Sequence, residues 1–286
     1  MDKQLAIKAS GQRFGFNRRV RTVIISIFLL GIIIGIFIAG IFIGDDAMAV
    51  DFTRKGIRPS WEYPFGTDWL GRNMLLRTVK GLSISIMVGT VASAVSAVLA
   101  TIIGIAAAMG SKWMDSAIGW LIDLVMGVPH LLLLILIAFA CGRGLTGLLT
   151  GIAVTHWTGL ARLVRAEVLQ IRSQQYITIS RRLGKSTGWI LLHHILPHVL
   201  PQFVVGLVLL FPHAILHESS LSFLGYGLPP EQPAIGIILA ESMKYLTGGM
   251  WWLAFFPGIT LVLIVILFDK LGENLKTLLD PYSAHE

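Results

Sequence analysis

The chain has 286 residues, of which 55% are hydrophobic and only 14% are charged, and its mean hydropathy is +0.75. An ordinary soluble domain carries about 25% charged residues, so this composition excludes a typical soluble enzyme and indicates a membrane protein. The net charge of +7 does not indicate a nucleic-acid-binding surface, because the 23 Lys and Arg residues are spread over separate loops.

Long runs without charged side chains predict an all-α, polytopic membrane protein with six transmembrane helices. A helix needs roughly 18 to 20 apolar residues to cross the bilayer core, and it satisfies its own backbone hydrogen bonds there. We expect the spans at 22–44, 82–110, 117–141, 145–162, 196–217 and 249–268. The chain then divides into an N-terminal tail, 1–21, and one transmembrane domain, 22–286.

The distribution of Lys and Arg predicts the orientation of these spans. With both termini in the cytoplasm, the inner segments hold 15 of these residues and the outer segments hold 8. The positive-inside rule favours that arrangement. The tail 1–21 is then cytoplasmic, segment 45–80 is an outer loop, and segment 163–192 is a cytoplasmic loop.

The second predicted span is rich in small residues, including Gly81, Gly89, Gly104 and Gly110. Small residues let helix backbones approach closely in lipid. We therefore expect this span to pack inside the bundle rather than face acyl chains.

The cytoplasmic loop 163–192 contains a short amphipathic helix that we expect to start near Ser173 and to end at Gly184. Its apolar side contains Tyr176, Ile179 and Leu183. Its basic side contains Arg181, Arg182 and Lys185. A helix of this kind either lies on anionic lipid or docks into a partner protein. The sequence Gly184-Lys185-Ser186 is not a nucleotide-binding loop, because G-x-x-x-x-G-K-[ST] requires Gly where Ile179 stands.

Two histidines near the end of the fifth predicted span form a candidate metal site. His213 and His217 are four residues apart, so they share one helical face, and Glu218 follows directly. Neutral imidazoles at that spacing can share a borderline cation such as Ni²⁺, with the carboxylate completing the site. Histidines near a membrane interface are also satisfied by water or backbone. For His130 and His156, in the third and fourth spans, we expect packing with a backbone hydrogen bond.

Residues 161–201, ARLVRAEVLQIRSQQYITISRRLGKSTGWILLHHILPHVLP, resemble the cytoplasmic coupling loop of permease subunits of binding-protein-dependent ABC importers. That signature is Glu-Ala-Ala, then Gly, then Ile-x-Leu-Pro or a close relative. This chain keeps Gly184 and Ile195-Leu196-Pro197, and has Thr178-Ile179-Ser180 where Glu-Ala-Ala would stand. Three further stretches resemble the dipeptide, oligopeptide and nickel permease group: YPFGTDWLGRNMLLR (63–77), ESSLSFLGYGLPPEQPAIG (218–236) and FDKLGENLKTLLDP (268–281).

This resemblance implies the ABC importer permease fold and a role as a transporter subunit rather than an enzyme. It implies no cofactor in this chain, with ATP and Mg²⁺ bound by partner ATPases. The implied partners are a homologous second permease, two ATP-binding subunits and an extracytoplasmic binding protein, in the cytoplasmic membrane of a prokaryote. The residues that would contact the ATPase are Tyr176, Ile179, Arg181, Arg182, Leu183, Gly184 and Lys185.

The substrate is expected from finer similarities. His213-x-x-x-His217 before Leu-Ser-Phe-Leu-Gly, together with THWTGLARLVR (155–165), looks more like the nickel permeases of this group than like its dipeptide permeases. The resemblance therefore favours import of nickel, free or chelated, through a site of His213, His217 and Glu218. The alternative is the same kind of subunit importing di- or oligopeptides.

Two other classes of protein fit the sequence less well. An intramembrane enzyme needs a nucleophile and a base that converge within the membrane, and Asp123 stands there without such a constellation. A secondary transporter carries its own coupling-ion site and usually inverted repeats. The single cysteine, Cys141, excludes an internal disulfide and a cysteine-based zinc site.

Overall fold

The computed structural model describes residues 18–279, and within this range the regular secondary structure is helical apart from one isolated bridge. Most of the predicted cytoplasmic tail, residues 1–17, lies outside the described residues. The end of the motif 268–281 lies outside them as well. The long helices are α1 (Arg18–Ile43), α2 (Met74–Met109), α5 (Leu145–Arg172), α8 (Leu196–Phe223) and α10 (Trp252–Leu279). The shorter ones are α3 (Lys112–Gly127), α4 (His130–Ala140), α6 (Gln175–Arg182), α7 (Thr187–Ile190) and α9 (Ile235–Met243).

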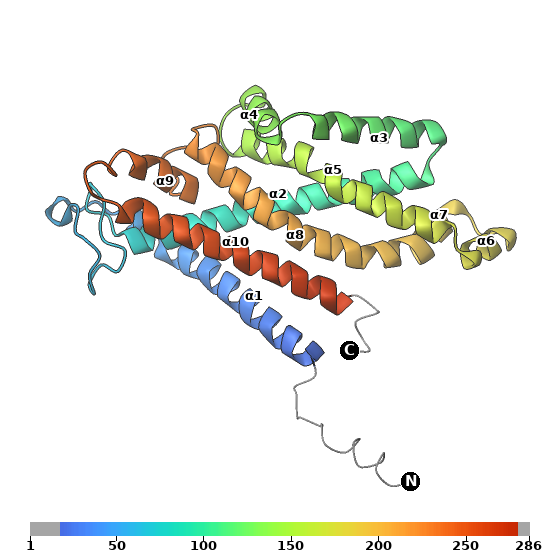
Figure 1. Ribbon diagram of the computed structural model, residues 1–286, viewed down its shortest axis with the longest axis horizontal. Helices are drawn as coiled ribbons and strands as arrows, with labels where there is room; N and C mark the ends of the chain where they lie inside the picture. Colours follow the sequence, from blue (N-terminus) through green and yellow to red (C-terminus); the bar gives the residue numbers. More distant parts are fainter. Residues whose placement is uncertain (1–17, 280–286) are drawn as a thin grey trace, which may run out of the picture.

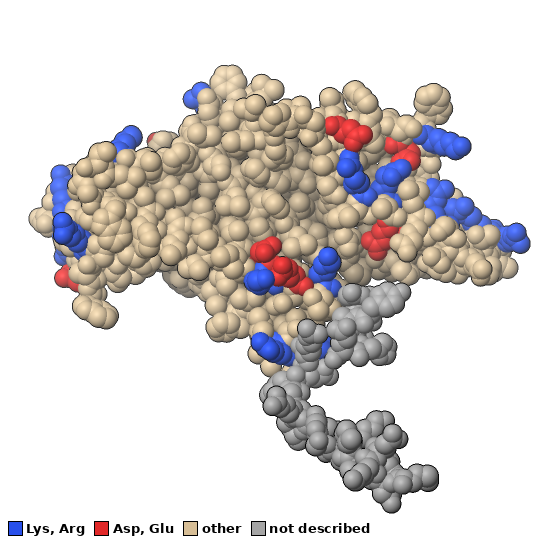
Figure 2. Space-filling view, viewed as in Figure 1, with Lys and Arg blue, Asp and Glu red and all other residues tan. Residues whose placement is uncertain are grey.

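The five long helices run roughly along the long axis of the molecule (Figure 1). The loop 44–73 and α9 lie at one end of this bundle, whereas α6 and α7 lie at the other. Figure 2 shows charged side chains at both ends and beside the start of α1 and the end of α10, with a broad uncharged surface between them. This distribution is the one that a bilayer requires.

The helices confirm an apolar membrane bundle, but not the number of six spans. Four helical segments are long and apolar enough to cross a membrane: Arg19–Ile43, Met74–Met109, Thr187–Phe223 and Trp252–Leu279. A fifth is obtained if the pair α3 and α4 is one broken span. The third predicted span, 117–141, is therefore not a continuous helix.

The bend between α3 and α4 measures 98° and falls at Val128 and Pro129. Proline lacks a backbone N–H and clashes with the preceding turn, and it drives the residue before it out of the helical region. Val128 accordingly has an extended backbone, with ψ at 138°. The α4 helix then starts at His130 and turns away from α3.

Helix α5 covers the fourth predicted span, yet it is not among the apolar helices. Half of its 28 residues are buried, including Thr155, His156 and Thr158. A helix enclosed by neighbours does not need an apolar surface, because lipid does not reach it. The neighbours are α2, α4 and α8 (Figure 1).

Small residues allow this enclosure, as predicted for the second span. The α2 helix buries Gly81, Gly89 and Gly104. A Cβ added at Gly104 would lie 2.7 Å from the carbonyl oxygen of Ala161 and 2.9 Å from the Cβ of Val164 on α5. The close approach of α2 and α5 therefore requires glycine at this position.

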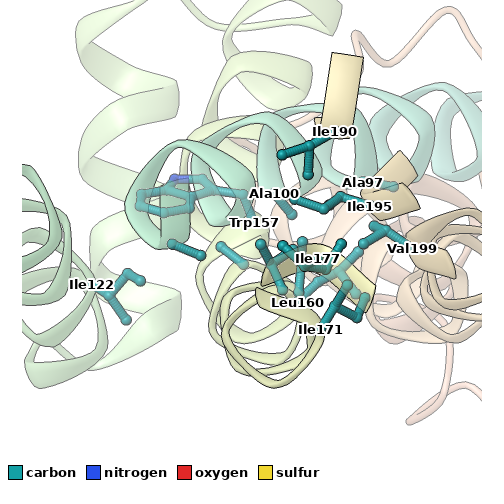
Figure 3. Close-up of a cluster of buried hydrophobic side chains, with 14 residues drawn as sticks. Ala97, Ala100, Ile122, Trp157, Leu160, Ile171, Ile177, Ile190, Ile195 and Val199 are labelled. Atoms are coloured by element: carbon teal, nitrogen blue, oxygen red, sulfur yellow. The ribbon is translucent and has the colours of Figure 1, made fainter. Parts of the chain in front are cut away.

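One apolar cluster fastens the end of the bundle that carries α6. Ile177 of α6, Ile190 of α7 and Val199 of α8 are fully buried against Leu160 and Ile171 of α5 (Figure 3). Ion pairs add to this on the other side of α5, where Arg162 contacts Asp123 at 2.7 Å and Arg165 contacts Asp115 at 2.5 Å. The position of α6 is thus set by this cluster, to which α5, α7 and α8 all contribute.

The opposite end is held by a buried charge network between the loop 44–73 and α9. Asp68 accepts hydrogen bonds from the backbone N–H groups of Leu70 and Arg72 and from the Arg72 side chain at 2.6 Å. Arg77, at the start of α2, contacts Asp68 at 3.4 Å and Glu241 of α9 at 2.5 Å. The Trp252 indole also donates to the carbonyl of Thr67. The loop is therefore an ordered part of the bundle.

We predict that Arg77→Gln destabilises the protein strongly and that Arg54→Gln does not. The Arg77 side chain is 0% exposed, and removing one partner of a buried ion pair costs about 3–5 kcal/mol because the other charges stay buried. Arg54 pairs with Asp51 while 54% exposed, and such pairs contribute about 0–1 kcal/mol. Thermal unfolding of the purified variants in detergent measures both, and equal midpoints would contradict the role given to the network.

Candidate transport site and coupling helix

A cavity of 450 Å³ lies between α3, α4, α5 and α8, and four histidines line it. The break at Pro129 places His130 on the first turn of α4, and burial of α5 places His156 beside it. Helix α8 contributes His213 and His217, one turn apart on one face. Three segments distant in sequence thus bring imidazoles to one place.

Three of these rings contact one another. The ring centroids of His130 and His156 are 4.6 Å apart, those of His130 and His217 are 4.6 Å apart, and those of His156 and His217 are 5.0 Å apart. One ring nitrogen of each residue lies within 4.8 Å of the corresponding atoms of the other two. We call His130, His156 and His217 the histidine cluster.

The hydrogen bonds of His156 fix its tautomer. Its Nδ1 lies 3.1 Å from the carbonyl oxygen of Ile152 and 3.1 Å from the Thr155 hydroxyl. A carbonyl oxygen only accepts, so Nδ1 carries the proton that is donated to Ile152, and the lone pair is on Nε2. That Nε2 is buried and has no hydrogen-bond partner, and the same is true of Nε2 of His130.

The predicted set of His213, His217 and Glu218 is arranged differently from what the sequence suggested. His217 belongs to the histidine cluster, while His213 lines the same cavity outside the cluster. Glu218 is fully buried, accepts hydrogen bonds from Ser222 at 2.9 Å and Ser219 at 3.2 Å, and does not line the cavity. His130 and His156 take the places beside His217, and the backbone hydrogen bond expected for His156 is present, to the Ile152 carbonyl.

The predicted amphipathic helix is α6, which starts at Gln175 rather than near Ser173. Gly184 ends it in a left-handed conformation, with φ at +81°. The Gly184 N–H donates to the carbonyl of Arg181, and the Lys185 N–H donates to that of Ser180, which closes the last turn. Ser186 then caps α7 by accepting from the Trp189 N–H. The prediction that Gly184 ends the helix is confirmed.

The side chains of α6 are divided between the bundle and the outside. Ile177 is fully buried against α5, whereas Ile179 is 55% and Leu183 is 74% exposed. The other exposed residues of the predicted coupling set are Tyr176, Arg181, Arg182, Gly184 and Lys185. An apolar patch flanked by cations is therefore presented at the end of the bundle, where Figure 1 shows α6 projecting.

The fold and the projecting helix together define a membrane-embedded transporter subunit. Residues 100–281 match the family described as "Binding-protein-dependent transport system inner membrane component". The chain belongs to this family. It is accordingly the permease subunit of an ABC importer and not an enzyme, and its family works with separate ATP-binding subunits and a substrate-binding protein.

Several relatives of this chain are named as peptide permeases. The chain is 35% identical over 229 residues to the "Dipeptide transport system permease protein DppC" of Bacillus subtilis (strain 168), covering 80% of this chain and 72% of that protein. It is also 35% identical over 235 residues to a protein of Brucella suis biovar 1 (strain 1330) that is provisionally named a peptide permease, covering 81% and 77%. These names do not support the expected closeness to nickel permeases.

Solved structures share the fold. A structure of the MetNI methionine ABC transporter in inward-facing conformations matches with a TM-score of 0.59 and 17% identity, over 72% of this chain and 98% of that chain. A chain of an amino acid ABC transporter matches with a TM-score of 0.54 and 16% identity, over 69% of this chain and 91% of that chain. At this identity the likeness concerns the fold alone.

Proposed function

We propose that this chain is the membrane subunit through which an ABC importer carries di- or oligopeptides into the cytoplasm. The observation that supports the peptide substrate is the 35% identity to the dipeptide permease over 80% of this chain. The peptide is delivered by an extracytoplasmic binding protein. The path lies between this chain and a homologous second permease, and two ATP-binding subunits complete the complex.

The orientation follows from charge and from the placement of α6. Both termini and α6 face the cytoplasm, where 15 of the 23 Lys and Arg residues lie. The loop 44–73 faces the outside, at the far end of the bundle (Figure 1). The bent pair α3 and α4 crosses the membrane as one broken span, and α5 crosses it as a helix enclosed by its neighbours. Together with the four apolar helical segments, these make six spans. The membrane is the cytoplasmic membrane of a prokaryote.

Helix α6 is the coupling helix in this proposal. The exposed Ile179 and Leu183 insert into an apolar groove of the ATPase, and Arg181, Arg182 and Lys185 contact acidic groups around that groove. Because Ile177 anchors α6 to α5, closure of the two ATPases moves the bundle with it. ATP binding then biases the permease pair between inward-open and outward-open states.

We predict that cells carrying the complete transporter take up a labelled dipeptide, and that deletion of this chain abolishes the uptake. The same cells receive ⁶³Ni²⁺ in a parallel assay. A transporter with an ATPase-inactive partner is the control, since uptake must depend on ATP hydrolysis. If nickel accumulates and neither a dipeptide nor a longer peptide enters, the peptide substrate is wrong.

We predict that the double change Ile179→Asp and Leu183→Asp separates the permease from its ATPases. Central apolar contacts of an interface contribute about 2 kcal/mol or more each, so binding falls by well over about tenfold. Co-purification of the ATP-binding subunits from detergent extracts measures this loss.

Thr178→Glu is the matched control for that change. It adds a negative charge to an exposed position of the same helix, where the ABC permease signature has Glu, and leaves both apolar contacts intact. We expect this variant to retain its ATPases. Retention by the double variant as well would show that α6 does not hold the ATPase.

A further inference from the structure

The histidine cluster has no role in the peptide transport proposed above. Three imidazoles from α4, α5 and α8 meet in one cavity, and two of their Nε2 atoms are buried without a hydrogen-bond partner. Buried polar atoms in native proteins are almost always satisfied. The cluster therefore offers ring nitrogens that a bound ligand could use.

Because ligand atoms of all three residues lie within 4.8 Å of one another in one cavity, we propose that His130, His156 and His217 form a binding site for a late first-row divalent metal ion, of the class of Ni²⁺, Cu²⁺ and Zn²⁺. Neutral imidazole is a preferred ligand of these ions. Hard ions such as Ca²⁺ and Mg²⁺ require oxygen ligands, and the residues that line the cavity include no carboxylate. This inference goes beyond the peptide importer proposed above and does not depend on it.

The tautomer of His156 prepares it for this role. Its Nδ1 proton is donated to the Ile152 carbonyl, so the lone pair is on Nε2, which is buried and has no hydrogen-bond partner. Metal-binding histidines commonly donate their other ring N–H to a backbone carbonyl or a carboxylate, which fixes the ring and its tautomer. His156 is only 9% exposed, and its ring centroid lies 4.6 Å from that of His130 and 5.0 Å from that of His217.

The three donor nitrogens need to move only slightly toward one another to bind a single metal ion. Imidazole nitrogens bind Zn²⁺ at about 2.0–2.1 Å, so two donors on one ion lie no more than about 4.2 Å apart. The donor atoms here lie within 4.8 Å of one another. His130 and His217 are half-buried, and rotation of their side chains toward His156 brings all three into range.

Three neutral ligands leave coordination positions open and do not neutralise the ion. An aqua ion fills those positions with water, whereas a small chelator with a carboxylate, such as a dipeptide, fills them with anionic donors. The second form avoids an unpaired double charge in a cavity of low polarity. Both forms present the same metal ion to the histidines. An experiment that supplies the aqua ion and the chelate separately therefore distinguishes them.

The test is equilibrium dialysis of the complete transporter, without a polyhistidine tag and in lipid nanodiscs, against ⁶³Ni²⁺. One arm uses the aqua ion and the other uses Ni²⁺ with excess diglycine. We expect about one His-dependent Ni²⁺ per copy of this chain in at least one arm. His156→Ala, His217→Ala and His130→Ala each raise the Kd at least about tenfold, since even loss of an outer partner of a metal ligand costs about 10–100-fold.

His193→Ala is the matched control. His193 is exposed, its ring stacks on Trp189 outside the cavity, and its Nδ1 bonds the Trp189 carbonyl. This variant keeps wild-type nickel binding. His156→Gln guards against misfolding because it keeps a polar side chain of similar size but is a poor nickel ligand, and thermal unfolding shows whether each variant is folded.

A direct spectroscopic signature completes the test. Electron paramagnetic resonance of the complex loaded with one equivalent of Cu²⁺ shows coupling to imidazole nitrogen, and this coupling is reduced in His156→Gln and unchanged in His193→Ala. Nickel binding and copper spectra that are identical in the wild type and in the three cluster variants overturn the proposal. Dipeptide uptake is measured separately, so uptake without metal binding refutes this inference alone, and metal binding without uptake refutes the peptide substrate alone.

Discussion

The structure depends on the enclosure of α5. This helix carries too many polar groups to face lipid, and half of its residues are buried by α2, α4 and α8. Enclosure is possible because Gly104 lets the backbones of α2 and α5 come together. The enclosure of α5 positions both the histidine cluster and α6, because α5 places His156 in the cavity and anchors α6 through Ile171 and Ile177.

The two ends of the bundle have opposite physical characters. At one end the loop 44–73 is held to the bundle by buried charges around Arg77. At the other end α6 has one buried side chain, Ile177, and a hydrogen bond between Ser180 and His194 at 3.2 Å, and it leaves Ile179 and Leu183 exposed. This asymmetry is consistent with the proposed function, in which a binding protein delivers substrate at the loop 44–73 and an ATPase docks on α6.

Much of the fold could be predicted from the sequence because apolar runs are local signals. They located the long helices, and Gly184 correctly ended α6. The break at Pro129 had a local signal that the apolar run 117–141 concealed. The histidine cluster had none, since three separate helices must pack before their faces meet. Glu218 was placed beside His217 by sequence, but neighbours on a helix point about 100° apart, and its carboxylate is held by serines instead.

The most direct test of the proposed orientation is to determine which side of the membrane each end of the bundle faces. In a Cys141→Ser background, a single cysteine is introduced at Trp61, which is fully exposed in the outer loop, or at Leu183 on α6. A membrane-impermeant maleimide is applied to intact spheroplasts and to inside-out vesicles stripped of the ATPases. We expect labelling of Trp61→Cys only in spheroplasts and of Leu183→Cys only in vesicles. Labelling of both positions from one side would contradict it.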